Sequence, residues 1–223
     1  MKKMKISSFF TIVIVGLLFA YFSAKAHQPN FINQQKEVEI KNPEISQAFY
    51  GFLDGQPITY SIKSSSPFTL YTQLLTPDIA TSKNNLFLKI KNNENGLILA
   101  NLDGLNFKWE RWYEEYGGDW YWKGPEFKKN IDAGTYLLTI SNPSNTGEYV
   151  LVVGETESFP ASQMPKMFSN LLKIKTEFFK KPWYSVFQNK IGGYLGLMVL
   201  ILIAIITGVT FLIKFIKNKK TNV

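Results

Sequence analysis

The sequence predicts a mainly β fold: an antiparallel β-sandwich, followed by an amphipathic juxtamembrane helix and one transmembrane helix. Three observations predict it. Short runs rich in Tyr, Phe, Ile and Thr alternate with Gly, Pro, Asn and Ser turns as far as residue 153. The hydrophobic period becomes helical after Ser162. Finally, Gly192–Ile213 is an apolar stretch that contains no charged residue.

The expected strands are short and occur without intervening helices, which is typical of a sandwich. Thr135–Ile140 and Tyr149–Val153 show the clearest pattern, because a polar turn precedes each of them. In chain order, the expected strands are Lys36–Lys41, Gln47–Leu53, Ile58–Ile62, Phe68–Leu75, Leu86–Ile90, Leu97–Leu102, Thr135–Ile140 and Tyr149–Val153.

The N-terminus has the pattern of a secretory signal. Three lysines at positions 2, 3 and 5 precede the apolar run Phe9–Phe22, and Ala24-Lys25-Ala26 offers small residues at a cleavage site. We therefore expect five regions along the chain. They are a signal peptide (1–26), an extracytoplasmic β-sandwich domain (27–160), a basic stalk helix (161–190), a transmembrane helix (191–213) and a cytoplasmic tail (214–223).

The net charge of +8 is concentrated at the two ends of the chain. Residues 27–190 hold equal numbers of basic and acidic side chains, so the excess does not indicate nucleic-acid binding. Lys214 and the lysines that follow it are placed as cytoplasmic lysines are expected to be. The charge pattern therefore predicts a single-pass protein of the cell (plasma or inner) membrane, with its N-terminal domain outside and its C-terminus in the cytoplasm.

The stalk region is basic and amphipathic. Apolar residues recur at helical spacing over Met164–Phe179, with Pro165 at an early helical position and Pro182 as a stop. This helix either packs on the sandwich or lies on the membrane surface. In the second case membrane lipid is a partner, and the lysines at the membrane surface are Lys173, Lys175, Lys180 and Lys181.

The predicted transmembrane helix begins with a glycine-rich edge. Gly192 and Gly196 have the G-x-x-x-G spacing that lets two helices approach closely, so a homodimer through these residues is one possibility.

The segment Phe107–Phe127 is the main candidate for a binding site, since it holds four of the five tryptophans beside several carboxylates. Three readings are open: rings that close the sandwich core, a surface that binds a protein or glycan, or a catalytic carboxylate pair. Alternation along a strand makes Trp120-Tyr121-Trp122 point to both faces, so we expect an exposed ring, Trp112 or Tyr121, beside Glu114 or Asp119. The candidate partner-binding residues are Trp109, Trp112, Tyr113, Glu114, Asp119, Trp120, Tyr121 and Trp122.

Composition excludes several chemistries. The chain has no cysteine, one histidine (His27) and one arginine (Arg111), so thiol catalysis, a thiolate zinc site and an arginine cluster are ruled out. No serine-hydrolase, zinc-protease or phosphate-loop motif is present. We therefore expect no catalytic residues, no metal and no cofactor.

Two segments carry a resemblance to a known family. Ile131–Ile140, which contains Ala133-Gly134-Thr135-Tyr136, and Thr146–Val153, which contains Thr146-Gly147-Glu148-Tyr149, resemble the last β-hairpin of bacterial pre-peptidase C-terminal domains. The resemblance implies a jelly-roll-like sandwich related to carbohydrate-binding modules, with Tyr136 and Ile140 on one side and Tyr149, Leu151 and Val153 paired beside them.

The sequence thus predicts a membrane-anchored extracytoplasmic binding module that is not an enzyme and that contacts a protein or glycan partner outside the cytoplasm. The alternative is a glycan-binding or carbohydrate-active protein that uses residues 107–127.

Overall fold

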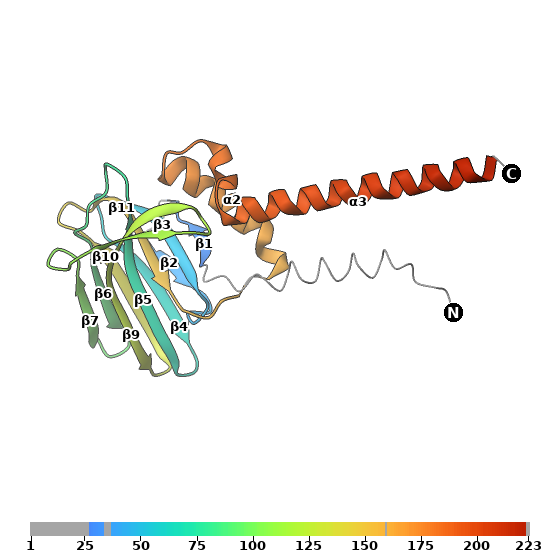
Figure 1. The fold of residues 1–223 in the computed structure, drawn as a ribbon. Helices are drawn as coiled ribbons and strands as arrows, with labels where there is room; N and C mark the ends of the chain where they lie inside the picture. Colours follow the sequence, from blue (N-terminus) through green and yellow to red (C-terminus); the bar gives the residue numbers. More distant parts are fainter. Residues whose placement is uncertain (1–26, 34–36, 159, 222–223) are drawn as a thin grey trace.

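A computed structural model describes residues 27–33, 37–158 and 160–221. The predicted signal peptide, residues 1–26, lies outside the described residues. The described chain forms two packed β-sheets followed by helices at the C-terminal end, as Figure 1 shows. The prediction of a mainly β two-sheet sandwich is therefore confirmed.

The larger sheet has the order β1-β3-β11-β5-β9-β8, and the smaller sheet has the order β2-β4-β10-β6-β7. The strands are β1 (Gln28–Phe31), β2 (Glu37–Ile40), β3 (Gln47–Asp54), β4 (Ile58–Ser64), β5 (Phe68–Pro77), β6 (Phe87–Asn92), β7 (Ile98–Asp103), β8 (Glu110–Glu114), β9 (Asp119–Ile131), β10 (Gly134–Ser141) and β11 (Thr146–Val153).

Pairing differs from the prediction at the edges of both sheets. The prediction of a purely antiparallel sandwich is wrong there, because β1 pairs with β3 and β2 pairs with β4 in parallel. The sequence also did not identify β1, and it left the strands β8 and β9 within the aromatic segment undefined.

The two strands that carry the family resemblance are not hydrogen-bonded to each other. β10 pairs with β4 and β6 in the smaller sheet, whereas β11 pairs with β3 and β5 in the larger one. Tyr149, Leu151 and Val153 therefore lie across the core from Tyr136 and Ile140, and the prediction that they pair side by side in a hairpin is wrong. The chain crosses between the sheets at Asn145, which has a positive φ of 47°.

Alternation along the strands builds the main core between the sheets. In β11, Tyr149, Leu151 and Val153 point into this core, where the hydroxyl groups of Tyr149 and Tyr60 lie 2.9 Å apart. The neighbouring Val150 and Val152 point to the opposite face of the sheet and are also buried. The sequence of a strand that is buried on both faces is a continuous run of apolar residues.

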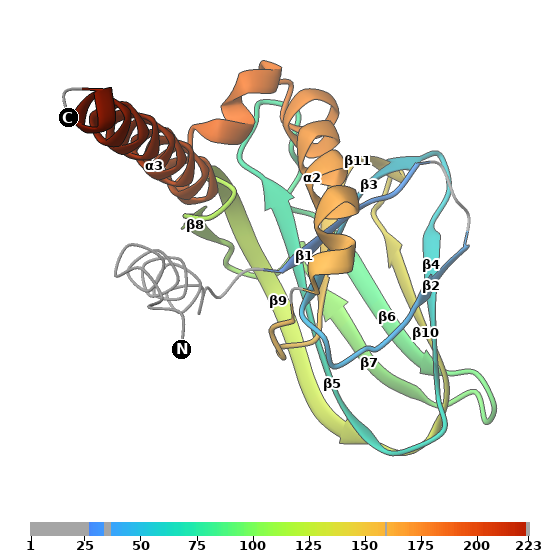
Figure 2. The same ribbon diagram turned by 90° about the vertical axis from the view of Figure 1, so that its right-hand side faces the viewer.

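The helical segment after the sandwich covers this second face. It comprises η1 (Ala161–Gln163), α2 (Met164–Lys173), the π-helical η2 (Ile174–Phe178) and η3 (Trp183–Phe187). The prediction of a helix over Met164–Phe179 is confirmed, with a wider last turn in which the Phe179 N–H donates to the Ile174 carbonyl at 2.9 Å. This turn buries Ile174, Phe178 and Phe179 against the larger sheet. Figure 2 shows α2 lying over that sheet.

The last helix, α3 (Lys190–Thr221), leaves the sandwich and points away from it in both views. Within the part of the chain that the structure describes, no helix has the combination of length and apolar character that crossing a membrane requires. The predicted transmembrane helix is therefore not confirmed.

Gly192 and Gly196, the two glycines of the predicted dimer motif, lie in different environments. Gly192 is buried, and a Cβ there would lie 1.9 Å from the Phe187 carbonyl oxygen of the same chain. Gly196 has open space around its Cα. η3 occupies the side of Gly192, and the possible homodimer through Gly192 and Gly196 stays a prediction.

Candidate functional site

The β8–β9 ribbon separates its aromatic residues onto two faces. Cross-strand pairing sets Tyr113 opposite Trp120 and Arg111 opposite Trp122, and directly opposed side chains share a face. The rings of Tyr113 and Trp120 lie 5.0 Å apart, and the Arg111 guanidinium lies 4.1 Å from the Trp120 ring. We call Arg111, Tyr113 and Trp120 the aromatic strip.

One side chain from a neighbouring loop, Asp78, holds the aromatic strip in place. Asp78 accepts from Arg111 Nε at 2.7 Å and from Trp122 Nε1 at 3.0 Å. Trp120 and Tyr113 nevertheless remain 42% and 38% exposed. The strip is therefore an ordered surface of two rings and one guanidinium.

The rings on the opposite face of the ribbon are those of Trp112 and Tyr121, and both are less exposed than the strip. Tyr121 is only 2% exposed, its hydroxyl lies 3.1 Å from that of Tyr50, and burial raises its pKa well above the usual value. Trp112 is half-buried beneath Lys123. The prediction that Trp112 or Tyr121 is the exposed ring is wrong, because Phe179 of the stalk packs 5.4 Å from Tyr121. The prediction that Trp120 and Tyr121 point apart is confirmed.

Trp109 packs towards the main core between the sheets. Its indole N–H donates to the Gly104 carbonyl at 2.6 Å, and its ring packs against the main core. A Cβ at Gly124 would lie 2.5 Å from this ring, so the glycine provides the room for it. Of the predicted binding residues, only Tyr113 and Trp120 therefore offer exposed rings.

Asp119 is the centre of a buried ion-pair cluster. Its carboxylate accepts from Lys175 Nζ at 2.5 Å and from Lys181 Nζ at 2.7 Å. The side chains of Asp119 and Lys175 are each 1% exposed. Burial lowers the pKa of Lys175, and the negative charge of Asp119 opposes that shift. The prediction that Lys175 lies at a membrane surface is wrong, because it faces inward under the β8–β9 hairpin.

The turn of the β8–β9 hairpin is bonded to the residues at the start of α3. The Gly117 carbonyl accepts from Lys175 Nζ and from Asn189 Nδ2, the latter at 2.9 Å. Lys190 pairs with Glu115 on the surface. Glu114 accepts the turn's N–H groups, and burial raises its pKa. Of the predicted surface lysines, Lys173 and Lys180 are exposed, and the half-exposed Lys181 is bound to Asp119.

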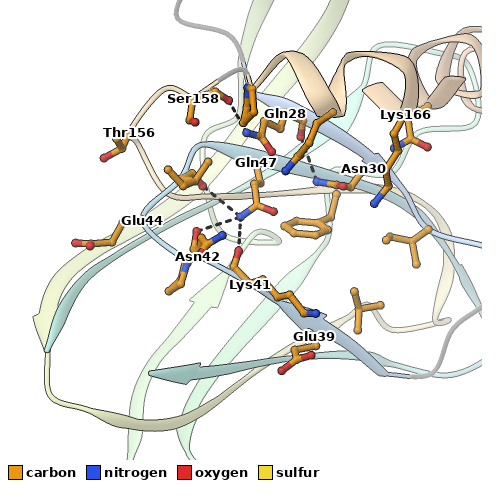
Figure 3. Close-up of a pocket in the computed structure, with 18 of the residues that line it drawn as sticks. Gln28, Asn30, Glu39, Lys41, Asn42, Glu44, Gln47, Thr156, Ser158 and Lys166 are labelled. Carbon is orange, nitrogen blue, oxygen red and sulfur yellow. Dashed lines mark hydrogen bonds between the residues drawn. The ribbon is translucent and has the colours of Figure 1, made fainter. Parts of the chain in front are cut away.

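A cavity of about 920 Å³ lies at the side of the sandwich where β1 and β2 are the edge strands (Figure 3). Gln47 reaches into it and donates from Nε2 to the Lys41 and Asn42 carbonyls at 2.9 and 3.2 Å. Other amide and hydroxyl side chains line it, with Lys166 of α2 on one side and Glu39 of β2 on another. Sequence reasoning missed this cavity, since its walls come from segments far apart in the chain.

Metal ligands are not brought together in the described part of the chain. No cluster of three or more His, Asp or Glu side chains that could hold a metal ion occurs there. His27 Nδ1 lies 2.5 Å from Ser46 Oγ, and burial lowers the pKa of His27 to about 4.

Comparison with known proteins bears on the fold alone. No protein-family model matches the chain, and no curated protein sequence matches it. The pre-peptidase C-terminal domain of collagenase from Bacillus anthracis is similar in structure, with 10% identity, a TM-score of 0.34, and coverage of 55% of this chain and 97% of that one. A CBM35 domain of Abf62 from Cellvibrio japonicus shows 16% identity and a TM-score of 0.28, and the match covers 48% and 74% of the two chains.

A ruminal GH26 endo-β-1,4-mannanase matches at 13% identity and a TM-score of 0.24, over 50% of this chain and 20% of that one. The predicted resemblance to pre-peptidase C-terminal and related sandwiches is thus confirmed as a structural similarity at low identity. At these TM-scores the similarity carries no argument about ligand or activity.

Proposed function

We propose that this chain is a membrane-anchored extracytoplasmic binding module that docks a partner protein on its aromatic strip and performs no catalysis. The observation that carries the proposal is the exposure of Trp120 and Tyr113 on an ordered ribbon. Trp, Tyr and Arg are the residue types enriched at binding hot spots, and all three meet here. The ion pair of Arg111 with Asp78 holds the surface in one conformation before binding, which lowers the entropy cost of association.

The membrane anchor is supported by sequence and by exposure. Gly192–Ile213 contains no charged residue, and lysines follow it. Large apolar side chains of α3 are exposed between Leu197 and Phe211, including Leu200 at 65% and Phe211 at 70%. A long row of exposed apolar side chains is unfavourable in water and favourable in a bilayer.

The proposed topology is tested by protease protection. With the full chain carrying a C-terminal tag, protease added to intact spheroplasts should digest the β-sandwich and leave the tag protected, since only residues 214–223 would lie in the cytoplasm. Permeabilised spheroplasts, in which the tag should be lost, are the control. A protected sandwich in intact spheroplasts would overturn the proposal.

Trp120→Ala is expected to weaken partner binding by about 2 kcal/mol, roughly thirty-fold in affinity. The ring is 42% exposed and lies outside the core, so the same change should lower stability by only about 1 kcal/mol. A photo-crosslinking amino acid in place of Tyr113 reports docking: one discrete adduct should form in cells and should be lost with Trp120→Ala. The matched control carries the cross-linker in place of Leu97, which is 58% exposed on the loop between β6 and β7.

The same adduct from both positions would show that the strip is not the docking surface.

A glycan is the second candidate ligand, favoured by the exposed ring pair beside the Asp78 carboxylate, which suits stacking on a sugar and hydrogen bonding to it. In that case the full chain should bind members of a glycan array, and Trp120→Ala should abolish the binding without a protein adduct at position 113.

A further inference from the structure

The stalk carries a second exposed aromatic group, away from the aromatic strip. Phe168 of α2 and Trp183, Tyr184 and Phe187 of η3 form what we call the Trp183 cluster. Trp183 lies 6.1 Å from Tyr184 and 6.4 Å from Phe187, and Phe187 lies 6.2 Å from Phe168. The rings therefore contact one another although they come from two helical segments.

These rings stay open to solvent. The exposed fractions are 63% for Trp183, 50% for Tyr184, 44% for Phe187 and 43% for Phe168. Nearby stalk rings behave differently, since Phe178 and Phe179 are buried against the outer face of the larger sheet. The stalk thus divides its rings between an inner face that docks on the sheet and an outer face that nothing in the described chain covers.

The position of the cluster indicates what covers it. Phe187 ends η3, and α3 begins three residues later at Lys190. From Leu197 onward, α3 exposes further apolar side chains. The cluster is therefore close in sequence to the start of the proposed anchor, and Figure 1 shows that α3 begins beside the sandwich.

The chemistry of the cluster fits the interface of a bilayer. Trp and Tyr combine an apolar ring with a polar N–H or O–H, and they gather at the headgroup level of membranes. Residues 163–190 carry six lysines and one acidic residue, Glu177. Lys173 and Lys180 of the same segment are exposed, and their positive charge complements anionic headgroups.

We infer that the Trp183 cluster inserts into the headgroup layer of the outer leaflet and fixes the orientation of the sandwich on an anionic membrane. This inference rests on the proposed membrane anchor. It adds a lipid-contacting surface on the folded domain to the anchoring helix. The hairpin turn that holds Asn189 and Lys190 then sets the angle between α3 and the cluster.

The test uses the full chain in vesicles of phosphatidylcholine and phosphatidylglycerol, with bromine atoms placed on the acyl chains near the headgroups. Brominated lipid should quench part of the tryptophan fluorescence, and Trp183→Phe should remove that quenching. Trp109→Phe is the matched control: Trp109 is held inside the sandwich by Gly104, so the quenching should persist.

Flotation of the vesicles separates the possible failures. A chain that floats with the vesicles but shows the same quenching in wild type and Trp183→Phe would overturn the inference and leave the anchor intact. The same holds if brominated lipid does not quench at all, as expected if a second copy of the chain covered the cluster. A chain that does not float would overturn the anchor and the inference together.

Discussion

Asp119→Asn is expected to destabilise the protein by about 3 to 5 kcal/mol, because it removes the carboxylate that pairs directly with the buried ammonium group of Lys175. Lys175 is 1% exposed. Among the described residues, Asp119 is the only acidic side chain within hydrogen-bond distance of its ammonium group. Lys181 can turn to water, since its side chain is 40% exposed, so the cost falls on Lys175. Urea unfolding of the full chain in detergent micelles, followed by tryptophan fluorescence, measures the loss.

Two controls separate the buried charge from a general effect of removing a carboxylate. Glu115→Gln removes the exposed pair with Lys190 and should cost less than about 1 kcal/mol. Asp119→Leu combined with Lys175→Met replaces the buried pair by apolar groups and should recover much of the stability. Equal losses for Asp119→Asn and Glu115→Gln would contradict the assignment.

The pH dependence of the Asp119→Asn variant supplies a further check. Burial lowers the pKa of Lys175, so the unfolded chain binds more protons at this site as pH approaches the ordinary lysine pKa of about 10. Stability rises with pH wherever the unfolded state binds more protons. Loss of the Asp119 charge lowers the pKa of Lys175 further, so the deficit of the variant should shrink as the pH rises towards that value.

The strands that sequence predicts well are those whose residues alternate or run apolar between polar turns. Thr135–Ile140 and Tyr149–Val153 fall inside β10 and β11, because each is buried on the face that its pattern marks. Their assignment to different sheets was not predictable from that pattern. Alternation fixes which face a side chain takes and leaves open which strand lies next to it.

The edges of the sandwich were harder to predict. β1 contains Pro29, a residue confined in sheets to edge positions and strand ends, and its four residues are all half-buried. Such a strand lacks the buried face that gives a periodic signal. In β8 and β9, aromatic rings occur at consecutive positions and therefore on both faces of the ribbon. Which ring lies on which face could be assigned only from the register of the strand pair.

The candidate site shows the same division between local and long-range information. Alternation correctly separated Trp120 from Tyr121, which neighbouring strand positions require. It could not show that the stalk covers the Tyr121 face, and so it named the wrong exposed ring. The sequence pattern predicted Lys175 as a surface lysine, because its partner, Asp119, lies 56 positions away and no neighbouring residue indicates the pair.

Phe178→Ala is expected to have an effect of similar size, about 3 to 5 kcal/mol, by opening a cavity under the stalk. Phe178 is fully buried, with its ring 5.3 Å from that of Tyr50 and 5.5 Å from that of Phe52. These contacts join the stalk to the larger sheet and do not lie in the core between the sheets. The loss should therefore free the stalk before the sandwich unfolds.

Limited proteolysis of the full chain in micelles distinguishes this local release from global unfolding. Trypsin should cleave Phe178→Ala rapidly between Lys173 and Lys181, at a denaturant concentration where the sandwich fragment still resists. Phe168→Ala is the matched control: the same substitution in the same segment removes a ring that is 43% exposed, so it should leave cleavage and unfolding nearly unchanged. Equal sensitivity of the two variants would mean that Phe178 does not hold the stalk on the sheet.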